Sequence, residues 1–231
     1  MILEQVKEQQ VIIFLSTTLL NKYLYHRQER TEESYKQLVE SLTGVFRDNI
    51  FTATGSLFEK LVFDKSQEDV YKLIPKEDYI YQYKQVKDLE INDKLKVRFT
   101  GYLDAISKDK KHIKDIKRVG IAKEGIDILD KYSDESTIQH NIYLYLIPEA
   151  ETFEYIICEA ETKIIGDIYN TPKDLVLENA QRKPKIHTLE YDRPDDDSLE
   201  AYLRSLILEY FYFLIEHNLD KKLLEKRLRV E

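Results

Sequence analysis

The pattern of apolar positions predicts helices at the start of the chain. Between Tyr35 and Leu42, apolar side chains recur at the spacing of one helical face. Ser16 and Thr31 are suitable N-cap residues in front of two such segments. We therefore predict that the chain begins with a helical part over residues 1–50.

Two further helices are predicted, one before the middle of the chain and one near its end. The first begins after Thr54 and carries Glu59 near the edge of its buried face. The second covers residues 198–217, where apolar residues recur at helical spacing behind Ser198. The acidic run Asp195–Asp197 in front of it suits the positive end of a helix dipole.

In the middle of the chain the period changes from that of a helix to two. The segment Leu95–Leu103 alternates apolar and polar residues, and Asn92 and Asp93 form a turn signal in front of it. The polar run Lys108–Lys111 is a second turn, and His112–Arg118 resumes as a strand. Together with an extended aromatic segment over 79–86, these features predict a meander of antiparallel strands.

After this meander the chain returns to helix and strand in turn. Ile138, Ile142 and Leu146 recur every four residues, which indicates a helix that Pro148 ends. Strands are predicted over 152–158 and 185–191. The fold class is therefore α/β, with a mixed central sheet that begins as an antiparallel meander and is flanked by helices. We expect one domain over residues 1–231.

Composition narrows the function classes. The chain has 231 residues and a single cysteine, so it contains no intramolecular disulfide and no iron–sulfur cluster held by four of its own thiolates. No apolar run approaches the roughly 20 residues that span a bilayer, so we expect a cytoplasmic protein with no membrane partner. The formal net charge is −8, but residues 84–118 carry a local positive excess. Such a strip is either a solvated hairpin or a contact for phosphates.

Two carboxylates are predicted to meet in the meander. A hairpin tip centred between Asp109 and Lys110 places Asp104 directly across from Asp115, with Cβ atoms about 4.5–5.5 Å apart. Opposed carboxylates repel, so the pair requires a shared proton, a lysine or a divalent cation. Lys117 lies on the same face as Asp115, because the two are separated by two positions on a strand. This set suits phosphodiester cleavage, and its alternative reading is a salt-bridged strand pair.

Four short motifs occur in an order that matches a known pattern. They are Gly55 to Glu59 on a helix, Gly101 to Asp104 on a strand, Asp115 to Lys117 on the next strand, and Gln139 to Tyr143 on the following helix. In this order and spacing the chain resembles the RecB-type branch of the PD-(D/E)xK nuclease superfamily, particularly its phage and prophage members. The resemblance implies a restriction-endonuclease-like core.

The resemblance also implies roles for individual residues. Glu59, Asp104, Asp115 and the main-chain carbonyl of Ile116 would bind Mg²⁺ or Mn²⁺, and Lys117 would contact the scissile phosphate or the attacking water. Glu59 stands where many relatives have histidine.

Two groups of residues are expected to contact the substrate. Gln139 and Tyr143 would position the DNA backbone or support Lys117, as the resemblance implies. Lys108, Lys110 and Lys111 at the hairpin tip are expected to contact DNA phosphates, because the local positive excess surrounds them.

Two functions therefore compete. The first is a metal-dependent DNA nuclease, an exonuclease or a recombination or repair nuclease of phage or prophage type. The second is a catalytically inactive nuclease-like fold that serves as a DNA- or protein-binding subunit. An acidic body with a small basic strip binds DNA weakly by itself, so the first function calls for a homo-oligomer or a partner protein.

Overall fold

The computed structural model describes residues 11–45, 48–122, 127–133 and 136–230. The strands are β1 (Val11–Leu15), β2 (Tyr79–Asn92), β3 (Leu95–Ser107), β4 (His112–Val119), β5 (Thr152–Glu159), β6 (Lys185–Asp192) and β7 (Leu228–Val230). The α-helices are α2 (Thr17–Glu29), α3 (Glu32–Thr43), α4 (Ile50–Phe63), α5 (Glu68–Tyr71), α6 (Gln139–Leu146), α7 (Lys173–Gln181), α8 (Asp196–Glu216) and α9 (Asp220–Arg227). A 3₁₀ turn, η1, covers Leu129–Tyr132.

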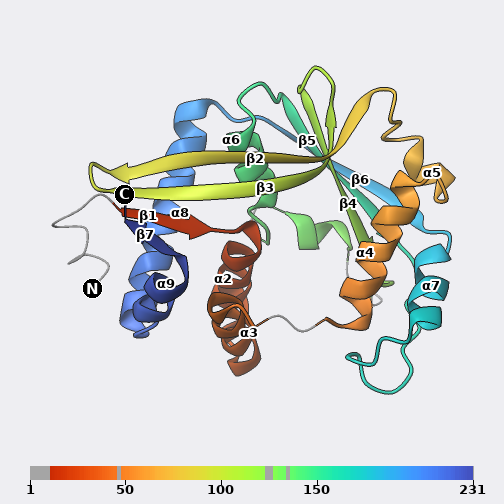
Figure 1. Cartoon of the computed structure of the whole chain (residues 1–231), viewed down its shortest axis with the longest axis horizontal. Coiled ribbons are helices and arrows are strands. Elements are labelled where there is room, and N and C mark those ends of the chain that lie inside the picture. The colour runs from red at the N-terminus through yellow and green to blue at the C-terminus, as the bar shows by residue number, and fades with distance from the viewer. Residues whose placement is uncertain (1–10, 46–47, 123–126, 134–135, 231) are drawn as a thin grey trace.

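A long ribbon of two antiparallel strands runs through the whole molecule. Strand β2 pairs with β3 from Tyr79 opposite Ser107 to Asn92 opposite Leu95, and so occupies one edge of β3 along its entire length. The other edge of β3 is divided between two partners. Figure 1 shows β1 and β7 beneath one half of the ribbon and β4, β5 and β6 beside the other half.

The divided edge of β3 leaves a gap between its two partners. Strand β1 pairs in parallel with Leu95–Phe99, and β4 pairs antiparallel with Ala105 and Ile106. Among the described residues, the stretch 100–104 therefore has no strand beside it on that edge. Strand β1 stops here because Ser16 caps α2, with its hydroxyl accepting a hydrogen bond from the Leu19 N–H, and the chain leaves the sheet.

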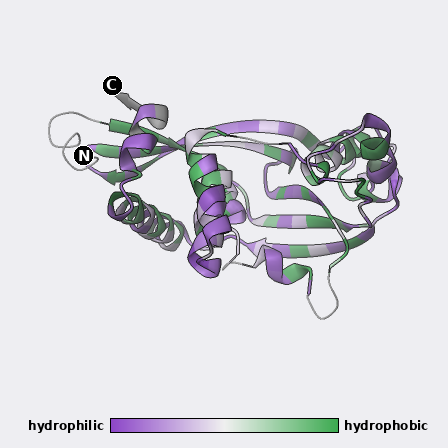
Figure 2. Cartoon of the chain, turned by 90° about the horizontal axis from the view of Figure 1, so that it is seen from below, coloured by the Kyte–Doolittle hydropathy of each residue, from purple (hydrophilic) through white to green (hydrophobic). Residues whose placement is uncertain are grey.

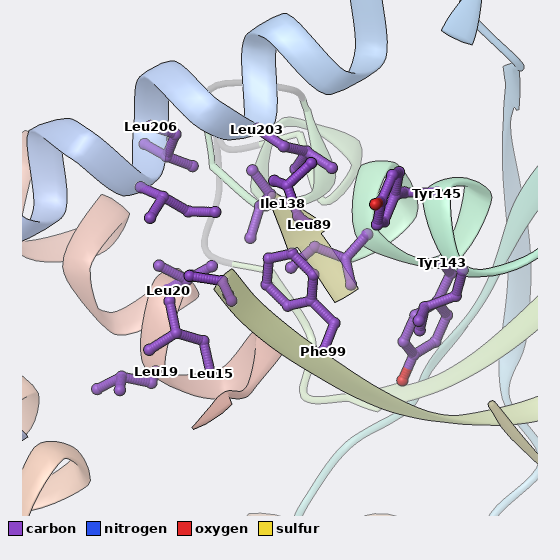
Figure 3. Close-up of a cluster of buried hydrophobic side chains, with 14 of the residues drawn as sticks. Leu15, Leu19, Leu20, Leu89, Phe99, Ile138, Tyr143, Tyr145, Leu203 and Leu206 are labelled. Carbon is purple, nitrogen blue, oxygen red and sulfur yellow. The ribbon is translucent and has the colours of Figure 1, made fainter. Parts of the chain in front are cut away.

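Helices cover both faces of the half-sheet formed by β4, β5 and β6. In β5, Phe153, Tyr155 and Ile157 belong to the large core that includes α6 and α8, whereas Ile156 and Cys158 face α4. Figure 2 shows the resulting alternation of hydrophobic and hydrophilic residues along the long strands. In Figure 3, Phe99 of β3 lies among side chains from α2, α6 and α8. No helix in the described part of the chain is long and apolar enough to cross a membrane.

The predicted fold class is confirmed: the structure is a mixed α/β fold whose sheet contains the β2–β3–β4 meander. The hairpin register is also confirmed, because Ala105 pairs with Lys114 and Ile106 with Ile113. The N-cap roles of Ser16 and Thr31 are confirmed by their hydrogen bonds.

Several boundaries differ from the prediction. The helical part over residues 1–50 is wrong at Val11–Leu15, which is a buried strand. A continuous apolar run with β-branched residues is typical of a strand covered on both faces.

Helix α4 begins at Ile50 rather than after Thr54, because the Asn49 side chain caps it. The final long helix covers 196–216, since Asp195 rather than Ser198 is its cap. Helices α7 and α9 and strand β7 were not predicted.

Gly101 lies where α6 approaches β3 most closely. A Cβ at this position would lie 2.5 Å from Leu146 Cδ1 and 3.1 Å from Tyr143 Cε1. Gly55 in α4 is different, because a Cβ there would meet no atom within 4 Å. Gly101 is therefore required by packing, whereas Gly55 is not.

We predict that the two glycines respond in opposite directions to alanine. Gly101→Ala should lower the free energy of unfolding by about 1–3 kcal/mol through overpacking. Gly55→Ala should raise it by about 0.5–1 kcal/mol, because alanine favours a helix interior. Urea unfolding measures both variants. Equal stability of Gly101→Ala and wild type would contradict the close approach of α6.

Candidate active site

A buried ion pair on β4 forms the centre of the site. The Nζ of Lys117 lies 2.5 Å from Oδ2 of Asp115, and the Asp115 side chain is only 2% exposed. The amide of Gln139, at the start of α6, donates a hydrogen bond of 2.8 Å to the other carboxylate oxygen of Asp115. The predicted shared face of Asp115 and Lys117 is thus realised, and Gln139 joins them from the covering helix.

Asp104 lies at the end of the gap in β3. The pairing of β3 with β4 stops at Ala105, one position before Asp104 and Asp115 would face each other. The Asp104 carboxylate instead accepts a hydrogen bond of 2.8 Å from the main-chain N–H of Ile116. A side chain therefore takes the place of a backbone acceptor where the two strands part. Ile116 enters the site through its main chain, while its side chain packs in the core beside α4.

Glu59 reaches the same region from α4. It is partly buried, and its Oε1 accepts a hydrogen bond from the side-chain amide of Gln82 in β2. Burial and the charge of Asp115 both act on it, so it lies within electrostatic range of the β4 pair. The structure therefore brings Glu59 of α4 and Asp104 of β3 into the same region as Asp115 and Lys117 of β4.

The charges of this cluster are not balanced. Burial, and next the charge of Asp115, raises the pKa of Glu59 and holds that of Asp104 well above its usual range. Burial also raises the pKa of Asp115, although Lys117 and Gln139 oppose the shift. Burial alone would lower the pKa of Lys117, but the carboxylates of Asp115 and Asp104 outweigh it and raise that pKa. Three carboxyl groups thus compete for one ammonium group.

The carboxylate oxygens of the cluster suit a hard divalent cation, but each carboxylate is bonded to another group of the chain. In the described part of the chain, no three His, Cys, Asp or Glu side chains are grouped closely enough to hold a metal ion. Asp104 is bonded to Ile116, Asp115 to Gln139 and Lys117, and Glu59 to Gln82. Carboxylate oxygens are the ligands that Mg²⁺ and Mn²⁺ prefer. Metal binding would require these carboxylates to lie closer together than they do here.

Tyr143 of α6 packs against β3. Its side chain is buried, its ring packs against Gly101, and its hydroxyl donates a hydrogen bond of 3.1 Å to the carbonyl of Tyr102. This carbonyl belongs to the stretch of β3 beside the gap. The Tyr143 side chain is thus occupied in fixing β3 to α6, and its role in positioning DNA or supporting Lys117 stays a prediction.

The tip lysines lie away from the carboxylates. Lys108 follows Asp104 by four positions, which is about 13 Å along an extended strand. Lys108 donates to the carbonyl of Glu77, Lys111 is paired with Glu151, and Lys110 lies 5.5 Å from the centre of the Tyr83 ring. Their contact with DNA stays a prediction.

Several other basic residues in the strip pair with acidic side chains or donate to main-chain carbonyls. Arg98 forms two hydrogen bonds of 2.6 Å with Asp88, and Lys114 lies 2.8 Å from Glu154. Arg118 donates to main-chain carbonyls, including those of Val119 and Ala160. Because Asp88 is already counted in the strip, only pairs with acids outside it, such as Lys111 with Glu151 and Lys114 with Glu154, reduce its positive excess.

Gln82 is the residue of this site that the sequence pattern did not reveal. It lies within an aromatic, extended segment, where a glutamine reads as an ordinary exposed strand residue. Only the three-dimensional contact with Glu59 places it in the cluster.

The chain matches no family model and no curated protein. Among solved structures, it is similar to a phage-related exonuclease from Haemophilus somnus 129PT, with 15% sequence identity, a TM-score of 0.47 and coverage of 89% of this chain and 96% of that chain. An alkaline exonuclease from Laribacter hongkongensis gives 12% identity, a TM-score of 0.35 and coverage of 88% and 93%. The protein SSO0001 gives 15% identity, a TM-score of 0.43 and coverage of 84% of this chain and 75% of that chain. At these values the likenesses carry no weight for function, which rests on the site itself.

Proposed function

We propose that the protein is a metal-dependent DNA nuclease, an exonuclease or a recombination or repair nuclease of phage or prophage type. The observation that carries this proposal is the convergence of Glu59, Asp104 and Asp115 on Lys117, at the point where β3 loses its strand partner. The same residues occupy the acidic and basic positions of the PD-(D/E)xK pattern.

The electrostatics of the cluster support a role beyond stability. Three carboxyl groups with raised pKa values are unfavourable in a folded protein, and a salt bridge with one lysine does not balance them. Groups with such perturbed pKa values gather at functional sites more often than elsewhere. A divalent cation would neutralise the excess negative charge, which is the simplest reason for the chain to keep all three acids together.

The residues of this chain have separable roles in the proposed reaction. Lys117 would stabilise negative charge that develops on the phosphate, and Asp115 holds its ammonium group in place. Gln139 fixes the Asp115 carboxylate from α6. Bound Mg²⁺ or Mn²⁺ would supply a Lewis acid for the attacking water and the leaving oxygen. Glu59, Asp104, Asp115 and the carbonyl of Ile116 would hold that ion.

A binding subunit without catalysis is the second candidate. Two observations favour it: every carboxylate of the cluster has an internal partner, and several cations of the basic strip are paired with acidic side chains. A nuclease of this charge would depend on a second copy of the chain or on a partner protein to hold DNA. Turnover of DNA separates the two candidates.

We predict that Lys117→Ala reduces cleavage of labelled DNA in Mn²⁺ by about 10²–10⁴-fold. Because this change leaves Asp115 buried without its cation, the double variant Asp115→Asn/Lys117→Met serves as a neutral pair that retains packing. It should fold and be equally inactive. Lys183→Ala is the control. Lys183 is an exposed lysine paired with Asp69, and its variant should cleave DNA like wild type. Absence of cleavage by wild type, or full activity of both site variants, would refute the nuclease.

We also predict that Asp104→Asn stabilises the metal-free protein. The raised pKa of Asp104 means that folding opposes its ionisation. The neutral amide removes this cost and can still accept from the Ile116 N–H. The free energy of unfolding at pH 8 should rise by about 1 kcal/mol.

The gain of Asp104→Asn should fade as the pH falls, because protonated Asp104 is already neutral below the pKa of the unfolded chain. Asp93→Asn in the exposed β2–β3 turn is the control, with little expected change. Guanidinium unfolding at several pH values measures both variants. A loss of stability in Asp104→Asn at pH 8 would contradict the charge imbalance described above.

A further inference from the structure

One residue near the start of β2 departs from the extended conformation. Gln82 has a φ of +52°, in the left-handed region that favours glycine, although the residues on both sides of it belong to the strand. A glycine would adopt this conformation without strain. The presence of glutamine indicates that its side chain is needed there.

The departure interrupts the β2–β3 ladder directly opposite Asp104. Tyr81 pairs with Ala105 and Tyr83 pairs with Leu103, so the position facing Gln82 is Asp104, and the register omits this one pair. The pairing with β4 also stops before Asp104. Among the described strands, Asp104 is thus without a ladder partner on either edge.

The same departure changes the face that β2 presents. Tyr79 and Tyr81 pack against the core beside α4, whereas Tyr83 packs against the core that includes α6. In a regular strand all three would lie on one face, and Gln82 would lie on the opposite face from Tyr81. The left-handed residue breaks this alternation and turns the Gln82 side chain toward α4, where its amide donates to Oε1 of Glu59.

We propose that Gln82 is a positioning residue for Glu59, held in a strained conformation so that its amide orients the Glu59 carboxylate toward Asp104 and Asp115 for a divalent cation. This inference rests on the proposed metal site and names a residue that the sequence motifs do not contain. Removing such an outer partner of a metal-binding carboxylate typically weakens metal binding by about 10–100-fold.

The test compares Gln82→Gly with Gln82→Ala and measures Mn²⁺ binding by calorimetry together with thermal unfolding of the metal-free protein. Both variants should bind Mn²⁺ about 10–100-fold more weakly than wild type. They should differ in stability, because glycine relieves the strain at φ +52° and alanine does not. Gln82→Gly should therefore unfold at the same or a higher temperature than wild type, and Gln82→Ala at a lower temperature than Gln82→Gly.

Gln85→Gly is the matched control. Gln85 lies in the same strand, pairs regularly with Gly101, and is not among the residues with positive φ. Glycine there should lower the unfolding temperature and leave Mn²⁺ affinity unchanged.

Different failures have different meanings. Wild-type Mn²⁺ affinity in Gln82→Gly, with clear Mn²⁺ binding by wild type, would overturn the role of Gln82 and leave the proposed nuclease standing. Absence of Mn²⁺ binding by wild type would overturn both. A DNA contact by Gln82 would raise KM with Mn²⁺ affinity unchanged, and that outcome would also overturn the positioning role.

Discussion

Strand β3 has two edges and three partners, and this constraint organises the molecule. Because β2 occupies one edge along the whole strand, β1 and β4 must share the other. The sharing is incomplete, and the residues between the two partners lie beside a gap. Asp104, Asp115 and Lys117 lie at the end of this gap, and Glu59 and Gln139 reach them from helices that cover the sheet.

Among the described residues, main-chain polar groups near the gap have no strand to bond with and require side-chain partners. The side chains that supply these hydrogen bonds form part of the site. The carbonyl of Tyr102 is satisfied by Tyr143, and the N–H of Ile116 by Asp104. An Asp used in this way lies close to Asp115, where its charge is unfavourable. The same geometry that completes the backbone hydrogen bonds therefore concentrates negative charge, which we interpret as the basis for cation binding.

Local patterns were enough to predict the meander, the hairpin register and the positions of Asp104, Asp115 and Lys117, because strand alternation and turn residues are short-range signals. Features that depend on long-range contacts were not predictable. Val11–Leu15 is a strand that pairs with β3, and Gln82 joins the site through its hydrogen bond with Glu59 of α4. The sequence also could not show that Asp88 and Glu154 pair with Arg98 and Lys114 of the basic strip.

The most direct test of this account is a crystal structure of the protein soaked in Mn²⁺, with the ion located by its anomalous scattering. The account predicts one strong peak beside the gap in β3, within coordination distance of Asp104 and Asp115, with Glu59 turned toward it. A peak elsewhere on the chain, or a soaked crystal in which Asp104 and Asp115 carry no ion, would contradict the claim that the gap builds a cation site.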